Sequence, residues 1–237
     1  MGERLYFRQL LAGQDFARGN RLARQMVNFA YVVGDRETGE AVAVDPAYAP
    51  DELVEVIGAD GMRLVGVLAT HYHPDHVGGD LFGHPVAGIV ELLEHIEVPV
   101  FVQKEEAPYV AAATGADRAA LSPLEPGAAI EVGDIRIECI HTPGHTPGSQ
   151  CFLVAGRLIA GDTLFLEGCG RTDLPGGNPE QMYESLFGRL ARLPDETVLY
   201  PGHLYAPEPS ATLGETRSSN YVLTPRSPAD WLAMFGN

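Results

Sequence analysis

Cysteine is scarce in this 237-residue chain, which contains only three. The three residues, Cys139, Cys151 and Cys169, cannot all pair with one another, and none lies in a Cys-x-x-Cys spacing. This usage argues against a disulfide scaffold and is typical of a reducing compartment. We expect Cys139 and Cys151 to be small buried strand residues.

Basic residues are also few, with 16 Lys and Arg against 32 Asp and Glu, a formal net charge of −16. No basic stripe is available to neutralise phosphates, which disfavours nucleic-acid or anionic-membrane partners. A small anionic substrate is not excluded, because metal ions and a few arginines can reverse the field inside a pocket. There is no apolar run of membrane-spanning length and no signal-peptide pattern, so the expected location is the cytoplasm.

Strand-like and helix-like stretches alternate along the chain. Strands are expected at 5–9, 27–33, 41–44, 64–70, 98–102, 128–132, 135–140, 150–154, 158–160 and 197–200. Helices are expected at 51–59, 90–95, 105–113, 179–192, 213–220 and 228–235, and 107–127 is the best loop candidate. Two successive groups of strands with interspersed helices indicate two sheets packed face to face, with helices outside.

The densest cluster of chemically active side chains is the run THYHPDH, which places His71, His73, Asp75 and His76 within six residues. Extended backbone puts His71 and His73 on the same side. A turn after Pro74 lets the other two face the same space. Imidazole and carboxylate groups suit zinc, iron or manganese. With eight histidines in the whole chain, such clustering is unlikely by chance and predicts a metal site.

Three more candidate ligands, His145, Asp162 and His203, each follow a predicted strand beside a glycine or proline that allows a sharp turn. Seven ligands are too many for one tetrahedral ion but suit two ions. One ion could take His71, His73 and His145, and the other Asp75, His76 and His203, with Asp162 as the bridge. Such a pair lowers the pKa of a bridging water and polarises a substrate oxygen, which is hydrolytic chemistry.

The motifs THYHPDH, TPGHTPG, GD and PGH, in this order, resemble those of the metallo-β-lactamase superfamily. The resemblance implies an α/β (α+β) protein with a four-layer αββα sandwich and a metal site at one edge of the two sheets. Residues 1–237 would form a single domain with a short C-terminal helical tail. The seven residues above would hold two divalent metal ions, with zinc favoured over iron or manganese.

Within the superfamily, the chain is similar to the glyoxalase II and persulfide dioxygenase group. The similarity lies mainly in the run GCGRTD, from Gly168 to Asp173, with support from residues 8–10 and 34–42. It implies that Arg171, Thr172 and Tyr205 contact the substrate. Arg171 could equally form a salt bridge with Asp173.

The chain differs from full-length glyoxalase II after His203. The remaining tail leaves little room for a separate glutathione-binding helical domain, and its only basic residues are Arg217 and Arg226. The stretch 82–88 resembles a small insertion near the site, either a lid or a surface loop.

Three functions follow from these patterns. The first is a glyoxalase II-like hydrolase acting on a small-molecule thioester such as a hydroxyacyl-thiol, in which Asp75 orients the attacking water. The second is a persulfide dioxygenase, with one iron(II) held by His71, His145 and Asp162. The third, a binding module that needs metal only to fold, is disfavoured because structural sites usually close with four ligands. A homodimer is suggested by the family alone.

Overall fold

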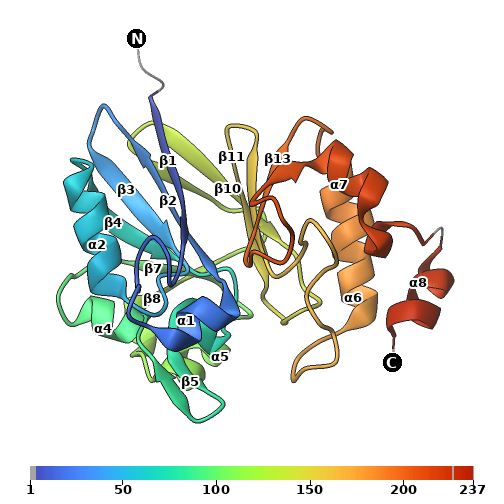
Figure 1. Ribbon diagram of the computed structural model, residues 1–237, viewed down its shortest axis with the longest axis horizontal. Helices are drawn as coiled ribbons and strands as arrows, with labels where there is room; N and C mark the ends of the chain where they lie inside the picture. The colour runs from blue at the N-terminus through green and yellow to red at the C-terminus, as the bar shows by residue number, and fades with distance from the viewer. Residues whose placement is uncertain (1–3, 226, 237) are drawn as a thin grey trace.

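Two six-stranded sheets lie at the centre of the molecule, in a computed structural model that describes residues 4–225 and 227–236. Figure 1 shows α1, α2, α4 and α5 outside one sheet and α6, α7 and α8 outside the other. The expected four-layer αββα sandwich is therefore confirmed. None of the described helices is long and apolar enough to cross a membrane.

The first sheet has the order β1-β2-β3-β4-β7-β8. Its strands are β1 (Leu5–Leu11), β2 (Phe29–Asp35), β3 (Glu40–Val44), β4 (Arg63–Leu68), β7 (Val100–Gln103) and β8 (Leu121–Leu124). The strands from β3 to β8 pair in parallel. Parallel neighbours need long crossover connections, and helices supply them here. These are α2 (Pro50–Ala59), α4 (Ile89–Leu93) and α5 (Ala107–Thr114).

The second sheet has the order β14-β13-β12-β11-β10-β9. Its strands are β9 (Ala129–Val132), β10 (Ile135–His141), β11 (Gln150–Val154), β12 (Arg157–Gly161), β13 (Val198–Pro201) and β14 (Ala211–Thr212). Only β12 and β13 pair in parallel among these described strands. The long connection between them contains α6 (Pro179–Tyr183), and α7 (Leu213–Ser219) and α8 (Pro228–Phe235) follow β14.

Alternating side chains explain why both faces of each sheet are covered. In β11, Cys151 packs under the C-terminal helices while Phe152 points between the sheets, and in β12 Leu158 and Ile159 divide in the same way. Successive strand residues face opposite sides, so two adjacent apolar residues supply two separate cores. The expected burial of Cys139 and Cys151 in strands is confirmed.

The segment 107–127 was the best loop candidate, and this interpretation is wrong for most of its length. Its first part is α5, which confirms the helix expected at 105–113, and a short 3-10 turn (Arg118–Ala120) and the strand β8, which were not predicted, follow. Pro123 hid this strand from a pattern-based prediction, because proline cannot donate to a sheet ladder. It is tolerated here because β8 lies at the edge of its sheet, where β7 is its one partner among the described strands.

The other differences are local. Asn178 caps α6 as predicted, by accepting from the backbone N–H of Gln181. The expected helix 179–192 then changes hydrogen-bond period, passing through a π-helical stretch (Glu184–Arg189) and a 3-10 turn (Leu190–Arg192). The helix α1 (Arg21–Met26) was not predicted, and the stretch 82–88 begins inside a hairpin of β5 (Gly79–Leu81) and β6 (His84–Val86).

Phe152 tests the core between the sheets. It is fully buried there, so Phe152→Ala should lower the free energy of unfolding by about 3–5 kcal/mol through lost burial and a cavity. Urea titration measures this change. Phe82→Ala is the control, because Phe82 is 89% exposed and its loss should change stability little. Equal effects of the two substitutions would contradict this account of the core.

Candidate metal centre

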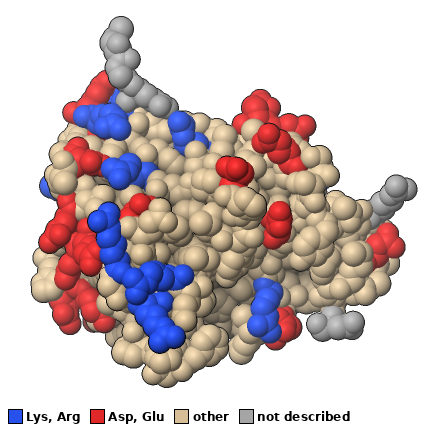
Figure 2. Space-filling model, viewed as in Figure 1, with Lys and Arg blue, Asp and Glu red and all other residues tan. Residues whose placement is uncertain are grey.

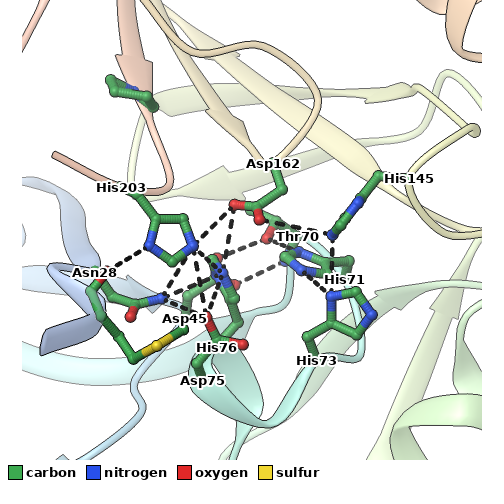
Figure 3. A network of polar contacts seen from close by, with 12 residues as sticks. Asn28, Asp45, Thr70, His71, His73, Asp75, His76, His145, Asp162 and His203 are labelled. Carbon is green, nitrogen blue, oxygen red and sulfur yellow. Dashed lines mark hydrogen bonds and ion pairs between the residues drawn. The ribbon is translucent and has the colours of Figure 1, made fainter. Parts of the chain in front are cut away.

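All seven predicted ligands lie where strands end, at one edge of the two sheets. His71 and His73 follow β4, and the single turn α3 (Pro74–Val77) carries Asp75 and His76. His145 lies in the loop between β10 and β11. Asp162 follows β12 and His203 follows β13; since these strands are parallel, their carboxyl ends meet at the same edge. Figure 3 shows the seven side chains pointing toward one another.

Three imidazoles form the first group. Nδ1 of His73 lies 3.1 Å from Nε2 of His71 and 3.0 Å from Nε2 of His145. The three ligand atoms of this group all lie within 4.8 Å of one another. This is the trio that the sequence assigned to one ion.

Hydrogen bonds on the far side of these rings decide which nitrogens carry protons. Nδ1 of His145 donates to the Arg171 carbonyl at 2.7 Å, because a carbonyl oxygen can only accept. The Thr70 hydroxyl donates to Asp45 at 2.6 Å and so accepts from Nδ1 of His71 at 3.0 Å. Both Nε2 atoms therefore present lone pairs to the centre of the group. Nδ1 of His73 carries at most one proton, so it cannot donate a full hydrogen bond to both of these nitrogens. A cation placed between the three rings can accept all their lone pairs.

The second group is Asp75, His76 and His203. Nδ1 of His76 donates to Asp45 at 2.9 Å, and Nδ1 of His203 donates to the Met26 carbonyl at 2.8 Å. Their Nε2 atoms then face each other at 3.3 Å. Asp75 Oδ2 lies 3.6 Å and 3.5 Å from these two nitrogens.

Asp162 lies between the two groups. Its Oδ1 is 3.4 Å from Nε2 of both His76 and His203, and its Oδ2 is 3.6 Å from Nε2 of His145. Oδ1 is buried and makes no hydrogen bond within the described part of the chain. A buried carboxylate oxygen without a donor is costly. The residues therefore fit a pair of divalent ions, with Asp162 placed to touch both.

The charges within the site agree with this fit. Burial lowers the pKa of His71 well below its usual range and that of His73 to about 4, so both rings are neutral at pH 7, as metal ligands must be. At His76 burial also disfavours charge, but Asp75 and Asp162 outweigh it and raise the pKa to about 10. The second group is thus a place where the protein favours a positive charge.

Two positioning residues escaped the sequence analysis. Asp45 follows β3, which is parallel to β4. Its carboxylate accepts directly from His76 of the second group, and it reaches His71 of the first group through the Thr70 hydroxyl. Asn28 donates to Asp75 Oδ2 at 3.1 Å. The position of Asp45 at a strand end was the one signal in the sequence. A residue that hydrogen-bonds to a metal ligand lies at no fixed distance from that ligand along the chain, so spacing does not reveal it.

Glu106 is the third missed residue, and it connects the two loops that carry the first group. Its Oε1 accepts from the Tyr72 amide at 2.8 Å and the Thr146 hydroxyl at 2.7 Å, and its Oε2 accepts from the Gly148 amide at 2.6 Å. Tyr72 lies between His71 and His73, and Thr146 follows His145. A Cβ on residue 148 would lie 2.4 Å from the Glu106 nitrogen, so this approach requires glycine.

A cavity of about 660 Å³ opens onto the ligands. Arg171 and Tyr205, two of the predicted substrate contacts, line it. The Tyr205 ring stacks on His203 with centroids 4.7 Å apart and planes 6° apart. Thr172 is not among the described lining residues, and its hydroxyl lies 3.5 Å from the Phe235 carbonyl. Arg171 pairs with Asp173, the alternative that its sequence allowed.

Residues 24–203 match the family described as the Metallo-beta-lactamase superfamily, most of the chain and all seven ligands. The chain belongs to the metallo-β-lactamase superfamily. Members of this superfamily bind divalent metals, and the two ligand groups here, with Asp162 between them, agree with that property.

Its relatives within the superfamily differ in activity. The human persulfide dioxygenase ETHE1 is 32% identical over 226 residues, covering 91% of this chain and 81% of the relative. A hydroxyacylglutathione hydrolase from Alkalilimnicola ehrlichii is 38% identical over 181 residues, covering 75% of this chain and 62% of that protein. The family is therefore shown, while hydrolase and oxidoreductase relatives both stand close to this chain.

Two crystal structures extend the comparison. ETHE1 from Myxococcus xanthus superposes with a TM-score of 0.79 at 28% identity, covering 98% of this chain and 90% of the other. TTHA1623, described in a di-iron-bound form, has a TM-score of 0.67 at 32% identity, covering 83% and 95%. The fold is thus shared over nearly the whole of this superfamily member.

Glu106→Gln should weaken the first metal group selectively. Gln presents its NH2 group to at least one of the three donors, which weakens the connection between the two loops. Changes of this kind typically cost about 10–100-fold in metal affinity. Chelator competition on the two ions measures the effect. Glu105→Gln is the matched control, since Glu105 is the exposed neighbour. Equal weakening of both ions, or of neither, would contradict the role assigned to Glu106.

Proposed function

We propose that this chain is a thioester hydrolase with a two-ion site, of the glyoxalase II type. The observation that carries the proposal is the position of Asp162, whose two oxygens approach ligands of separate three-residue groups. A single ion would need only some of the seven candidate ligands. The hydroxyacylglutathione hydrolase and the di-iron form of TTHA1623 are similar to this chain and support the same assignment.

His71, His73 and His145 would hold one ion, Asp75, His76 and His203 the other, with Asp162 shared. Such a pair supplies an activated water and polarises the thioester carbonyl. Asp75 belongs to the second group and also lines the cavity, so its carboxylate can accept a hydrogen bond from the attacking water and orient it. Asn28 holds Asp75 in place.

Tyr205 supplies a proton donor at the wall of the same cavity. Burial raises the pKa of its phenol, so the hydroxyl keeps its proton at neutral pH. Its ring stacks on His203, which limits the directions in which the phenol can point. We propose that it donates a hydrogen bond to the bound substrate.

The number of ions tests this function. Anaerobically purified protein should contain about two equivalents of zinc, iron or manganese and should hydrolyse thioesters. His203→Ala should keep about one equivalent, Asp162→Ala should weaken both, and each should lower kcat/KM by a factor on the order of 10² or more. Elemental analysis and thioester assays measure these changes.

His84→Ala is the matched control, because His84 is exposed on the β5–β6 hairpin and lies outside the ligand groups. It should change neither metal content nor turnover. One firmly bound ion together with no thioester hydrolysis would contradict the proposal.

The second candidate is a mononuclear iron persulfide dioxygenase. The 91% coverage of this chain by human ETHE1 favours it, and His71, His145 and Asp162 are the ligands it would use. Oxygen uptake with glutathione persulfide, by protein that holds one iron, would support this activity in place of hydrolysis. No uptake by iron-loaded protein would remove it.

A further inference from the structure

The cavity beside the metal ligands has apolar walls. The apolar and aromatic side chains that line it beside the ligands include those of Met26, Leu81, Phe82, Phe165, Leu174 and Tyr205. They come from distant parts of the chain: the end of α1, the β5–β6 hairpin, the segment after β12 and the loop after β13. Figure 1 shows these elements around the same end of the two sheets. A wall of this composition favours an apolar group next to the reacting bond.

Among the described residues that line the cavity, no Lys or Arg side chain is left unpaired to receive a carboxylate of the substrate. Among its described lining residues, Arg171 is the only Lys or Arg. Its guanidinium already donates to both oxygens of Asp173, at 2.9 Å and 2.7 Å. Asp80 and Glu167 add two acidic side chains to the same wall. An anionic group placed there would have to displace Asp173 from Arg171 and would lie beside two other carboxylates, which is unfavourable.

Aromatic rings are arranged to receive a flat ligand. Tyr205 lies on His203, and Phe165 meets the Tyr205 ring edge-on at 5.1 Å and 81°. Tyr205 is half exposed, so part of its surface faces the cavity. Phe82, at the tip of the β5–β6 hairpin, lines the cavity while 89% of it is exposed. A bound apolar group would cover both rings, with the offset or edge contacts that aromatic pairs prefer.

We infer that this cavity takes an uncharged thioester with an aromatic or branched aliphatic acyl group, in preference to a thioester of glutathione, which carries two carboxylates. The inference rests on the proposed thioesterase function for the reaction itself. Beyond that function, the inference specifies which class of thioester the enzyme accepts. The apolar wall would bind the acyl group, and the Arg171–Asp173 pair together with Asp80 and Glu167 would disfavour carboxylates.

The test compares two thioesters with the metal-loaded protein. The phenylacetyl thioester of N-acetylcysteamine, which is neutral, should have a kcat/KM at least 10-fold above that of S-lactoylglutathione. Equal or better turnover of S-lactoylglutathione would overturn the inference and leave the hydrolase function intact.

Binding separates the two proposals if neither thioester is hydrolysed. Two stable thioethers, S-phenethyl-N-acetylcysteamine and S-methylglutathione, are titrated by calorimetry into the same protein. Tighter binding of the neutral thioether would support the inference even where hydrolysis fails. Tighter binding of the glutathione thioether would overturn it.

Asp173→Asn tests the charge argument directly. The side chains of Arg171 and Asp173 are 67% and 48% exposed, so the fold should tolerate this change. Freeing Arg171 should raise kcat/KM for S-lactoylglutathione about 10-fold, mainly through KM, and leave the neutral thioester unchanged. An unchanged ratio between the two substrates would contradict the role of the ion pair.

Phe82→Ser tests the apolar wall, with Met234→Ser as the matched control at an exposed apolar residue outside the cavity. Phe82→Ser should raise KM for the phenylacetyl thioester about 5-fold and leave KM for the acetyl thioester unchanged. Met234→Ser should change neither. Equal effects of Phe82→Ser on both thioesters would count against the hairpin as part of the binding wall.

Discussion

The convergence of imidazole nitrogens and carboxylate oxygens at one edge of the two sheets is the constraint on which the site depends. Imidazole lone pairs and carboxylate oxygens do not attract one another, so bringing seven of these side chains together is unfavourable unless cations lie between them. The fold tolerates this arrangement because the strands that carry the ligands are held by three cores, one between the sheets and one beneath the helices on each outer face.

Hydrogen bonds behind the ligands convert their proximity into a defined chemical state. Acceptors such as the Met26 and Arg171 carbonyls and the Asp45 carboxylate take the Nδ1 protons and leave Nε2 free. Asp45 and Glu106 each connect segments that are far apart in sequence, and both lie close behind the ligands. The precision of the site therefore depends on residues outside the ligand motifs.

The acyl and thiol groups of the proposed substrate would be recognised by apolar contacts and charge, and not by metal coordination. The metal ligands determine where the reacting bond must lie, whereas the cavity walls determine which groups can flank it. Relatives with hydrolase and dioxygenase names match this chain to a similar degree, so ligand motifs alone do not separate their substrates. In the substrate preference that we infer, the apolar surface, the ion-paired arginine and the acidic side chains of this chain's wall would provide the distinction by opposing charged groups.

Sequence alone predicted the seven candidate ligands, their division into two groups and the layered fold, because these depend on local patterns. Strands alternate with helices at recognisable intervals, and glycine and proline mark the turns where the ligands lie. Tertiary structure alone decided that Asp45, Asn28 and Glu106 support those ligands, that Pro123 lies in an edge strand and that Arg171 is paired. The physical reason is that each depends on a contact between segments, or on a position in a sheet, that no spacing along the chain encodes.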